Sequence, residues 1–201
     1  TPILGDDFPG CAVLRSPVNR GWSGGNNAGI VTPSADLDMA LRAIAFGAMG
    51  TAGQRCTTMR RLFVHDSVYD QLVPRLIKAY GSVSVGNPLT TQALVGPLVD
   101  RAAWEGMQAA LDAARAEGGT VHGGERVADA GPEAAFYARP ALVEMPRQSG
   151  PVLEETFAPI LYVMRYTEFE DVIAQHNAVG AGLSSSIFTL DLREAEAFLS
   201  A

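Results

Sequence analysis

The feature that most constrains this fold is an alternation of short apolar runs with segments of helical periodicity. The candidate strands, most of them apolar, fall at residues 28–31, 62–64, 120–122, 141–143, 160–164 and 186–189. Helical spacing of apolar residues marks the segments at about 35–50, 67–80, 101–117, 169–176 and 192–199. The run at 160–164 is continuously apolar, as is typical of parallel strands buried on both faces. The sequence therefore predicts an α/β fold, with an open, mostly parallel sheet covered by helices on both faces.

Two of these helices carry more specific predictions. The first should bury a set of residues at helical spacing, namely Leu37, Leu41, Ile44 and Ala48. The second should begin at Ser67, because residues 67–70 read Ser-Val-Tyr-Asp and resemble a capping box.

A single cysteine sits in a setting that suits chemistry. Residues 53–58 read Gly-Gln-Arg-Cys-Thr-Thr, so Cys56 lies between a cation and two hydroxyls, on a turn after the first helix. A neighbouring cation favours the thiolate, which is the form that attacks electrophiles. A lone cysteine is also typical of a small buried hydrophobic residue, so this segment alone leaves both interpretations open.

The charge balance narrows the class of partner. The chain has a formal net charge of -7, which argues against nucleic acid and against an anionic membrane surface. No apolar run approaches the roughly 20 residues that span a bilayer. The two cysteines and three histidines show neither a disulfide framework nor metal-ligand spacing, so no metal is predicted. We therefore expect a cytoplasmic protein with a small-molecule partner.

Three segments together resemble the signatures of the aldehyde dehydrogenase superfamily. They are residues 24–28, Gly-Gly-Asn-Asn-Ala; residues 53–58; and residues 154–160, Glu-Glu-Thr-Phe-Ala-Pro-Ile. Further matches at 60–65, 85–88, 96–98 and 182–189 extend the resemblance over about residues 24–201. The sequence is most similar to the antiquitin-like enzymes, the aminoadipate-semialdehyde (piperideine-6-carboxylate) dehydrogenases. The doubled asparagine, the arginine before the cysteine and the Phe-Ala-Pro-Ile-Leu-Tyr-Val run favour that subfamily.

The resemblance implies a mechanism and a set of site residues. Cys56 would attack the aldehyde carbon, NAD would accept a hydride, and water activated by a glutamate would hydrolyse the thioester to a carboxylic acid. Arg55 would bind the carboxylate of an anionic aldehyde; without the resemblance, a structural salt bridge is the better explanation. Glu155 would bind the nicotinamide ribose, and Phe157 would pack near the nicotinamide. Glu155 without the resemblance reads as a solvated charge beside Glu154.

Departures from the family pattern concern the two ends. Residues 1–23 show no clean period and are expected to be irregular or misjoined, and Trp22 stands where the family has its general-base glutamate. Residues 24–201 would form part of the catalytic domain, without the NAD-binding domain or the C-terminal end. We expect little NAD-dependent turnover from these 201 residues alone, and a homo-oligomer for the full-length protein.

Two alternative functions remain open. The chain could be an inactive fragment or pseudoenzyme that lacks the general base and the cofactor domain. It could also be a cofactor-free cysteine hydrolase or redox thiol, although no histidine is identifiable from the sequence as the base for Cys56.

Overall fold

The computed structural model describes residues 24–201, which form a single six-stranded sheet. The strands are β1 (Asn27–Val31), β2 (Met59–His65), β3 (Thr120–His122), β4 (Ala141–Glu144), β5 (Ile160–Tyr166) and β6 (Ser185–Phe188). Their order across the sheet is β3-β4-β5-β2-β1-β6, and each neighbouring pair is parallel except β3 with β4. The predicted mostly parallel sheet is confirmed, with one antiparallel strand at its edge.

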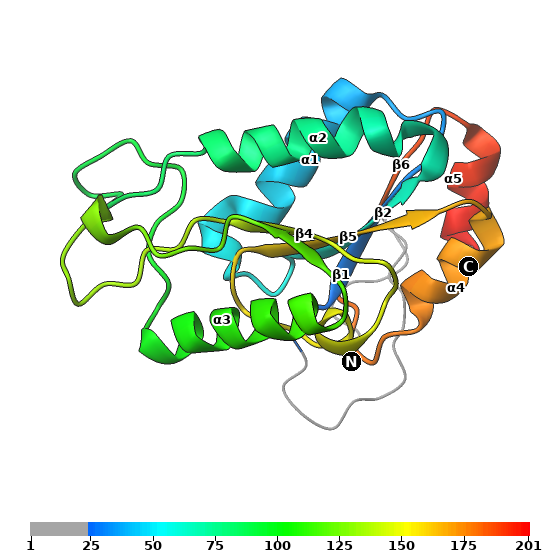
Figure 1. Ribbon diagram of the computed structural model, residues 1–201. Coiled ribbons are helices and arrows are strands. Elements are labelled where there is room, and N and C mark those ends of the chain that lie inside the picture. The colour runs from blue at the N-terminus through cyan, green and yellow to red at the C-terminus, as the bar shows by residue number, and fades with distance from the viewer. Residues whose placement is uncertain (1–23) are drawn as a thin grey trace, which may run out of the picture.

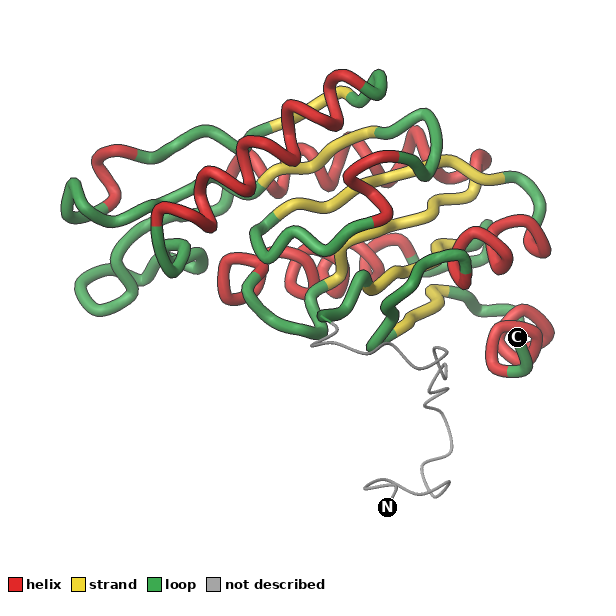
Figure 2. The backbone as a smooth tube through the Cα atoms, turned by 90° about the horizontal axis from the view of Figure 1, so that it is seen from below, coloured by secondary structure: helices red, strands yellow, loops and turns green. Residues whose placement is uncertain are grey.

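Helices cover both faces of the sheet. The helices are α1 (Leu37–Met49), α2 (Asp66–Ser82), α3 (Arg101–Ala116), α4 (Phe169–Asn177) and α5 (Leu192–Leu199), with short 3-10 turns η1 (Gly50–Gly53), η2 (Ala128–Ala130) and η3 (Gly150–Leu153). Figure 1 shows α1 and α2 on one face, and α3 and α4 on the other. Seen from below in Figure 2, the strands run side by side through the middle of the molecule. This is the three-layer arrangement expected for alternating strands and helices.

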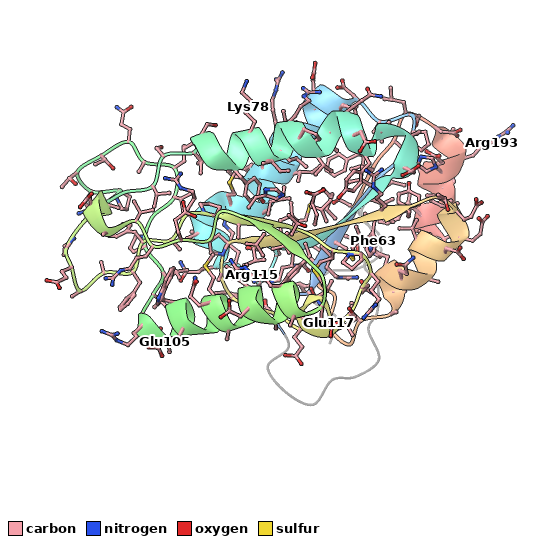
Figure 3. The ribbon with its side chains drawn as sticks, in the orientation of Figure 1. Phe63, Lys78, Glu105, Arg115, Glu117 and Arg193 are labelled. Atoms are coloured by element: carbon pink, nitrogen blue, oxygen red, sulfur yellow. The ribbon has the colours of Figure 1, made fainter. Side chains whose placement is uncertain are left out.

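The core lies along β2 and β5 at the centre of the sheet. Leu62, Phe63 and Val64 of β2 are fully buried, as are Leu161 and Val163 of β5. Figure 3 shows Phe63 between the helical layers, whereas Lys78 and Arg193 point outward. Burial on both sheet faces explains why these strands read as continuous apolar runs.

Strand β2 also carries two buried cations that the apolar pattern did not lead us to expect. Arg60 is 2% exposed and Arg61 is 1% exposed. Successive side chains of a strand point to opposite faces, so the two guanidinium groups lie on opposite sides of the sheet. Their hydrogen-bond partners differ accordingly, as described below.

Two details of the helices differ from the sequence predictions. Helix α2 begins at Asp66 rather than at Ser67, because the ring Nδ1 of His65 accepts a hydrogen bond from the Ser67 amide and acts as the N-cap. Helix α1 buries Ala40 and Met49 along with the predicted Ile44 and Ala48. The predicted Leu37 and Leu41 are only partly buried against the core. The buried face of α1 therefore follows residues 40, 44 and 48, with the two leucines at its border.

Some sequence predictions concern residues that are not described. Residues 1–23, including Trp22, lie outside the described part of the chain. Within residues 24–201, no helix is both long and apolar enough to span a bilayer. The same residues contain no cluster of three or more histidine, cysteine or acidic side chains that could hold a metal ion.

Candidate active site

The candidate site lies at the amino ends of the parallel strands, where four loops meet. Cys56 is on the loop that leads into β2, and its side chain is exposed. It is the one cysteine within residues 24–201. The loops that lead into β1, β5 and β6 lie beside it, as their hydrogen bonds show.

A left-handed turn connects the end of α1 to the loop that carries Cys56. Thr51, Ala52 and Gly53 have positive φ angles of 56°, 53° and 68°. At Gly53 a Cβ atom would lie 2.4 Å from the backbone carbonyl of Ala158, so no larger residue fits there. A left-handed non-glycine residue costs about 1–2 kcal/mol, and such residues persist only where surrounding contacts hold them. The turn therefore fixes the direction in which the cysteine segment leaves the helix.

Arg55 immediately precedes Cys56 in the chain, and its charge is accessible. Its side chain is exposed, its Nε donates to the Thr51 hydroxyl, and its guanidinium lies 5.4 Å from the centre of the Phe46 ring. Its terminal nitrogens donate to no group in the described part of the chain. A partly anchored guanidinium with free donors can accept a carboxylate in a bidentate manner.

Asn27 ties three of the loops together, and sequence reasoning gave it no individual role. Its Nδ2 donates to the carbonyls of Cys56 at 2.7 Å and Thr58 at 2.8 Å. Its Oδ1 accepts from the amides of Leu183 and Ser184 at 3.0 and 2.8 Å. This side chain, 2% exposed, therefore holds the cysteine loop against the loops that lead into β1 and β6.

Glu155 and Phe157 lie on the loop before β5. One oxygen of Glu155, Oε1, accepts from the Gly25 amide at 3.1 Å and from Arg60 at 3.0 Å. The other oxygen, Oε2, lies against Gly24, where a Cβ atom would come within 1.2 Å of it. Phe157 is 45% exposed, and its ring centre lies 5.3 Å from the Arg60 guanidinium. Two donors thus hold one oxygen of the carboxylate, whereas the other accepts no hydrogen bond from residues 24–201.

Arg60 joins the cysteine loop to the loop of Glu155. Its side chain donates to the carboxylate Oε1 of Glu155 and to the backbone carbonyls of Gly25, Gly53, Arg55, Thr156 and Ala158. Burial lowers the pKa of Arg60, and the nearby Glu155 carboxylate opposes that shift. The structure therefore brings the segments of all four predicted site residues together around one guanidinium.

Arg61 plays a different part on the opposite face. It donates to the carbonyls of Asn26, Gln175 and His176, and to the side chain of Gln148. Burial lowers the pKa of Arg61 to about 10. These contacts join β1 to α4 and reach none of the predicted site residues.

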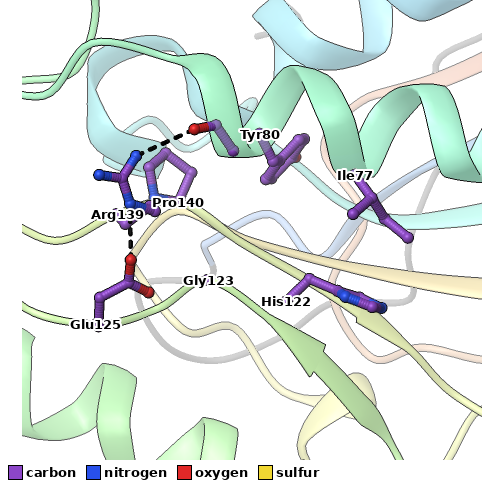
Figure 4. A pocket seen from close by; sticks show the side chains of 8 residues that line it. Ile77, Tyr80, His122, Gly123, Glu125, Arg139 and Pro140 are labelled. Atoms are coloured by element: carbon purple, nitrogen blue, oxygen red, sulfur yellow. Dashed lines mark hydrogen bonds and ion pairs between the residues drawn. The ribbon is translucent and has the colours of Figure 1, made fainter.

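A separate cleft lies away from these residues. It has a volume of about 260 Å³ and lies between the end of α2 and the segments next to β3 and β4 (Figure 4). Its Arg139 pairs with Glu125 at 2.7 Å, so the charges of these two side chains offset each other. None of the predicted site residues lines this cleft.

Comparison with known proteins identifies the family. Residues 23–201 match the sequence model of the family described as "Aldehyde dehydrogenase family". The chain belongs to the aldehyde dehydrogenase family. This aldehyde dehydrogenase chain is 47% identical over 165 residues to aldehyde dehydrogenase family 7 member A1 of Pisum sativum. It is 46% identical over 170 residues to alpha-aminoadipic semialdehyde dehydrogenase of Rattus norvegicus. These matches cover 82% and 84% of the chain, but only 32% and 31% of the relatives.

Solved structures agree with this aldehyde dehydrogenase fold. Lactaldehyde dehydrogenase from Escherichia coli superposes with a TM-score of 0.82 at 34% identity, over 88% of this chain and 37% of that chain. A 3,6-anhydro-L-galactose dehydrogenase in complex with NAP also gives a TM-score of 0.82, at 30% identity, over 88% of this chain and 38% of that chain. The chain spans about a third of the length of the curated relatives that it matches.

Proposed function

We propose that the protein oxidises an aldehyde to a carboxylic acid, with Cys56 as nucleophile and NAD as hydride acceptor. The observation that carries this proposal is the meeting of the Cys56 and Glu155 loops around the buried guanidinium of Arg60. Membership of the aldehyde dehydrogenase family supports the assignment of Cys56 to the aldehyde and of Glu155 to the cofactor. The reaction would consume the aldehyde, NAD⁺ and water, and yield the carboxylic acid, NADH and a proton.

Cys56 would carry the covalent steps. Its thiolate sulfur adds to the carbonyl carbon and gives a hemithioacetal. Bound NAD supplies the hydride acceptor that allows this adduct to become a thioester. Water then hydrolyses the thioester, which releases the acid and frees the thiol. The exposed side chain of Cys56 is consistent with access by an aldehyde.

Arg55 directs the proposal toward an anionic aldehyde, L-2-aminoadipate 6-semialdehyde in lysine catabolism. Its terminal nitrogens are available for a carboxylate next to the thiol, and a planar guanidinium matches a carboxylate with two hydrogen bonds. The name of the rat relative, alpha-aminoadipic semialdehyde dehydrogenase, supports the same substrate. The product would be 2-aminoadipate.

Glu155 and Phe157 are the residues we assign to the cofactor. A carboxylate with one open oxygen beside a bare glycine suits a ribose hydroxyl, and an exposed ring suits a flat heterocycle. No strand-to-helix connection within residues 24–201 carries the glycine-rich turn that binds a diphosphate. These residues therefore fit the nicotinamide riboside half of NAD, and the rest of the cofactor would need groups from other parts of the protein.

The test uses the full reading frame that encodes this chain. NADH formation from aminoadipate semialdehyde is followed by absorbance, with Cys56→Ser as the variant and Cys11→Ser, the other cysteine, as the matched control. Loss of turnover with Cys56→Ser and retention with Cys11→Ser is expected. Equal turnover in both variants, or no NADH formation by the wild-type protein, would show that the proposal is wrong.

A second candidate, an inactive relative, is favoured by Trp22. By the sequence resemblance, this tryptophan stands two residues before Gly24, where the family has its general-base glutamate, and an indole cannot accept that proton. An enzyme without that base should acylate Cys56 but hydrolyse the thioester slowly. A burst of one NADH per Cys56 followed by slow turnover would indicate this defect, and the absence of saturable NAD binding would indicate a pseudoenzyme.

Two further properties stay predictions. We propose that the full-length protein forms a homo-oligomer, which light scattering after size-exclusion chromatography would measure. We also propose a cytoplasmic location, which fractionation of source cells would test.

A further inference from the structure

We propose that Arg60 is a positioning residue of this site, which orients the Glu155 carboxylate and thereby sets the strength of dinucleotide binding. The inference rests on the proposed function, because Glu155 is assigned there to the cofactor. Arg60 itself is 2% exposed and is not placed to touch a substrate. It would act through the residues that its guanidinium holds.

The hydrogen bonds of Arg60 use every donor of its side chain. Nε donates to the Gly25 carbonyl at 3.1 Å. Nη1 donates to Thr156 at 2.7 Å and to Gly53 at 3.3 Å. Nη2 donates to Arg55 at 3.2 Å and to the Glu155 carboxylate at 3.0 Å. A guanidinium has five N–H groups in a rigid fork, so a lysine could not reproduce this set.

The position of the Glu155 carboxylate depends on this fork. Arg60 of strand β2 and the amide of Gly25, in the loop before β1, both bind Oε1. With Oε1 fixed in this way, Oε2 is directed to the space beside Gly24. A carboxylate attached by one oxygen to two donors loses rotational freedom, so its second oxygen is oriented before any ligand arrives.

Charge also favours this assignment. Glu155 is the one carboxylate that forms an ion pair with Arg60 in the described part of the chain, and its side chain is 21% exposed. Removal of one partner from a largely buried pair leaves the other charge uncompensated. Loss of the Arg60 cation should therefore release the carboxylate toward solvent, away from Gly24.

Arg61 supplies the natural comparison within the same strand. It is buried to the same degree and donates to the backbone carbonyls of three residues. However, it contacts neither Glu155 nor the cysteine loop. An effect that is common to both arginines would reflect general loosening of the sheet, whereas an effect of Arg60 alone would reflect the site.

The experiment is a double-mutant cycle in the full-length protein. The dissociation constant of NADH is measured by fluorescence titration for Arg60→Lys, for Glu155→Gln and for the double variant, with Arg61→Lys as matched control. Arg60→Lys should weaken binding about tenfold, equivalent to about 1.4 kcal/mol, and should add less than about twofold once Glu155 is changed. An equal loss in both Glu155 backgrounds, or a similar loss in Arg61→Lys, would overturn the proposal.

A second measurement separates this inference from the proposed function. The rate of Cys56 alkylation by iodoacetamide needs no cofactor, and peptide mass spectrometry distinguishes Cys56 from Cys11. Arg60→Lys should change that rate at least about threefold, because the guanidinium holds the Arg55 and Gly53 carbonyls of the cysteine loop. If the wild-type protein binds no NADH, the proposed function is wrong, and the alkylation rate alone tests the role of Arg60. An alkylation rate that is the same in Arg60→Lys and in the wild-type protein would then overturn that role.

Discussion

The substitution Asn27→Asp tests how strongly one buried amide holds the site together. The change keeps the size of the side chain and keeps an oxygen for the amides of Leu183 and Ser184. It replaces the Nδ2 donor, which now bonds the carbonyls of Cys56 at 2.7 Å and Thr58 at 2.8 Å, with a carboxylate oxygen. These two carbonyl oxygens and that of Gly25, which also accepts from Nδ2 at 3.2 Å, would then face a buried negative charge.

The expected loss of stability follows from these contacts. Each lost hydrogen bond contributes about 1 kcal/mol, and a buried group left without a partner adds about 1–3 kcal/mol. We therefore expect the free energy of unfolding to fall by about 3–5 kcal/mol. Urea denaturation followed by circular dichroism measures this quantity, with an unchanged m value as evidence that the unfolding transition itself is comparable.

The control is Asn177→Asp, the same chemical change at an exposed position at the end of α4. It should change stability by less than about 1 kcal/mol. A loss below about 1 kcal/mol for Asn27→Asp as well would refute the view that Asn27 holds the cysteine loop.

Two further predictions concern backbone and pH. Gly53→Ala should cost more than about 2 kcal/mol, because the new Cβ would meet the Ala158 carbonyl at 2.4 Å and the residue has a positive φ. Gly106→Ala in α3, where a Cβ meets nothing within 4 Å, should instead stabilise by about 0.5–1 kcal/mol; similar thermal shifts in both would contradict the prediction. Burial, and then Arg61, lower the pKa of His176 from 6.5 to about 4, so the unfolded chain binds this proton more tightly than the folded one. Stability from this group is complete above about pH 6.5 and falls by up to about 3 kcal/mol as the pH drops to about 4; a pH series of denaturation curves should show that loss in wild type and not in His176→Gln.

Much of the fold followed from the sequence because its strands are buried on both faces. The run at 160–164 had no polar residue to obscure it, and it became β5. The direction of β3 was not predictable, since a three-residue strand carries no signal of its orientation. The start of α2 was missed because the His65 ring accepts a hydrogen bond from the Ser67 amide and so caps the helix two residues earlier than the Ser67 hydroxyl would have done.

The site was predictable only in part, for a physical reason. Cys56 and Glu155 stood out through a family resemblance, which is confirmed at the level of the family. Arg60 and Asn27 were missed because their importance depends on which loops meet in three dimensions. Arg60 binds Glu155 from 95 positions away, and Asn27 bonds Ser184 across 157 positions. The one sequence feature that indicated Arg60 was the pair of arginines directly before the apolar run at residues 62–64.

The opposite directions of Arg60 and Arg61 also limit how the sequence between the left-handed turn and β2 can change. Side chains of a strand alternate, so a shift by one position would turn Arg60 away from the site and bring Arg61 toward it. A gain or loss of one residue between Gln54 and Met59 that shifts β2 against β1 and β5 would therefore exchange the two guanidiniums between the faces of the sheet. For Arg60, the position along the strand counts as much as the type of residue.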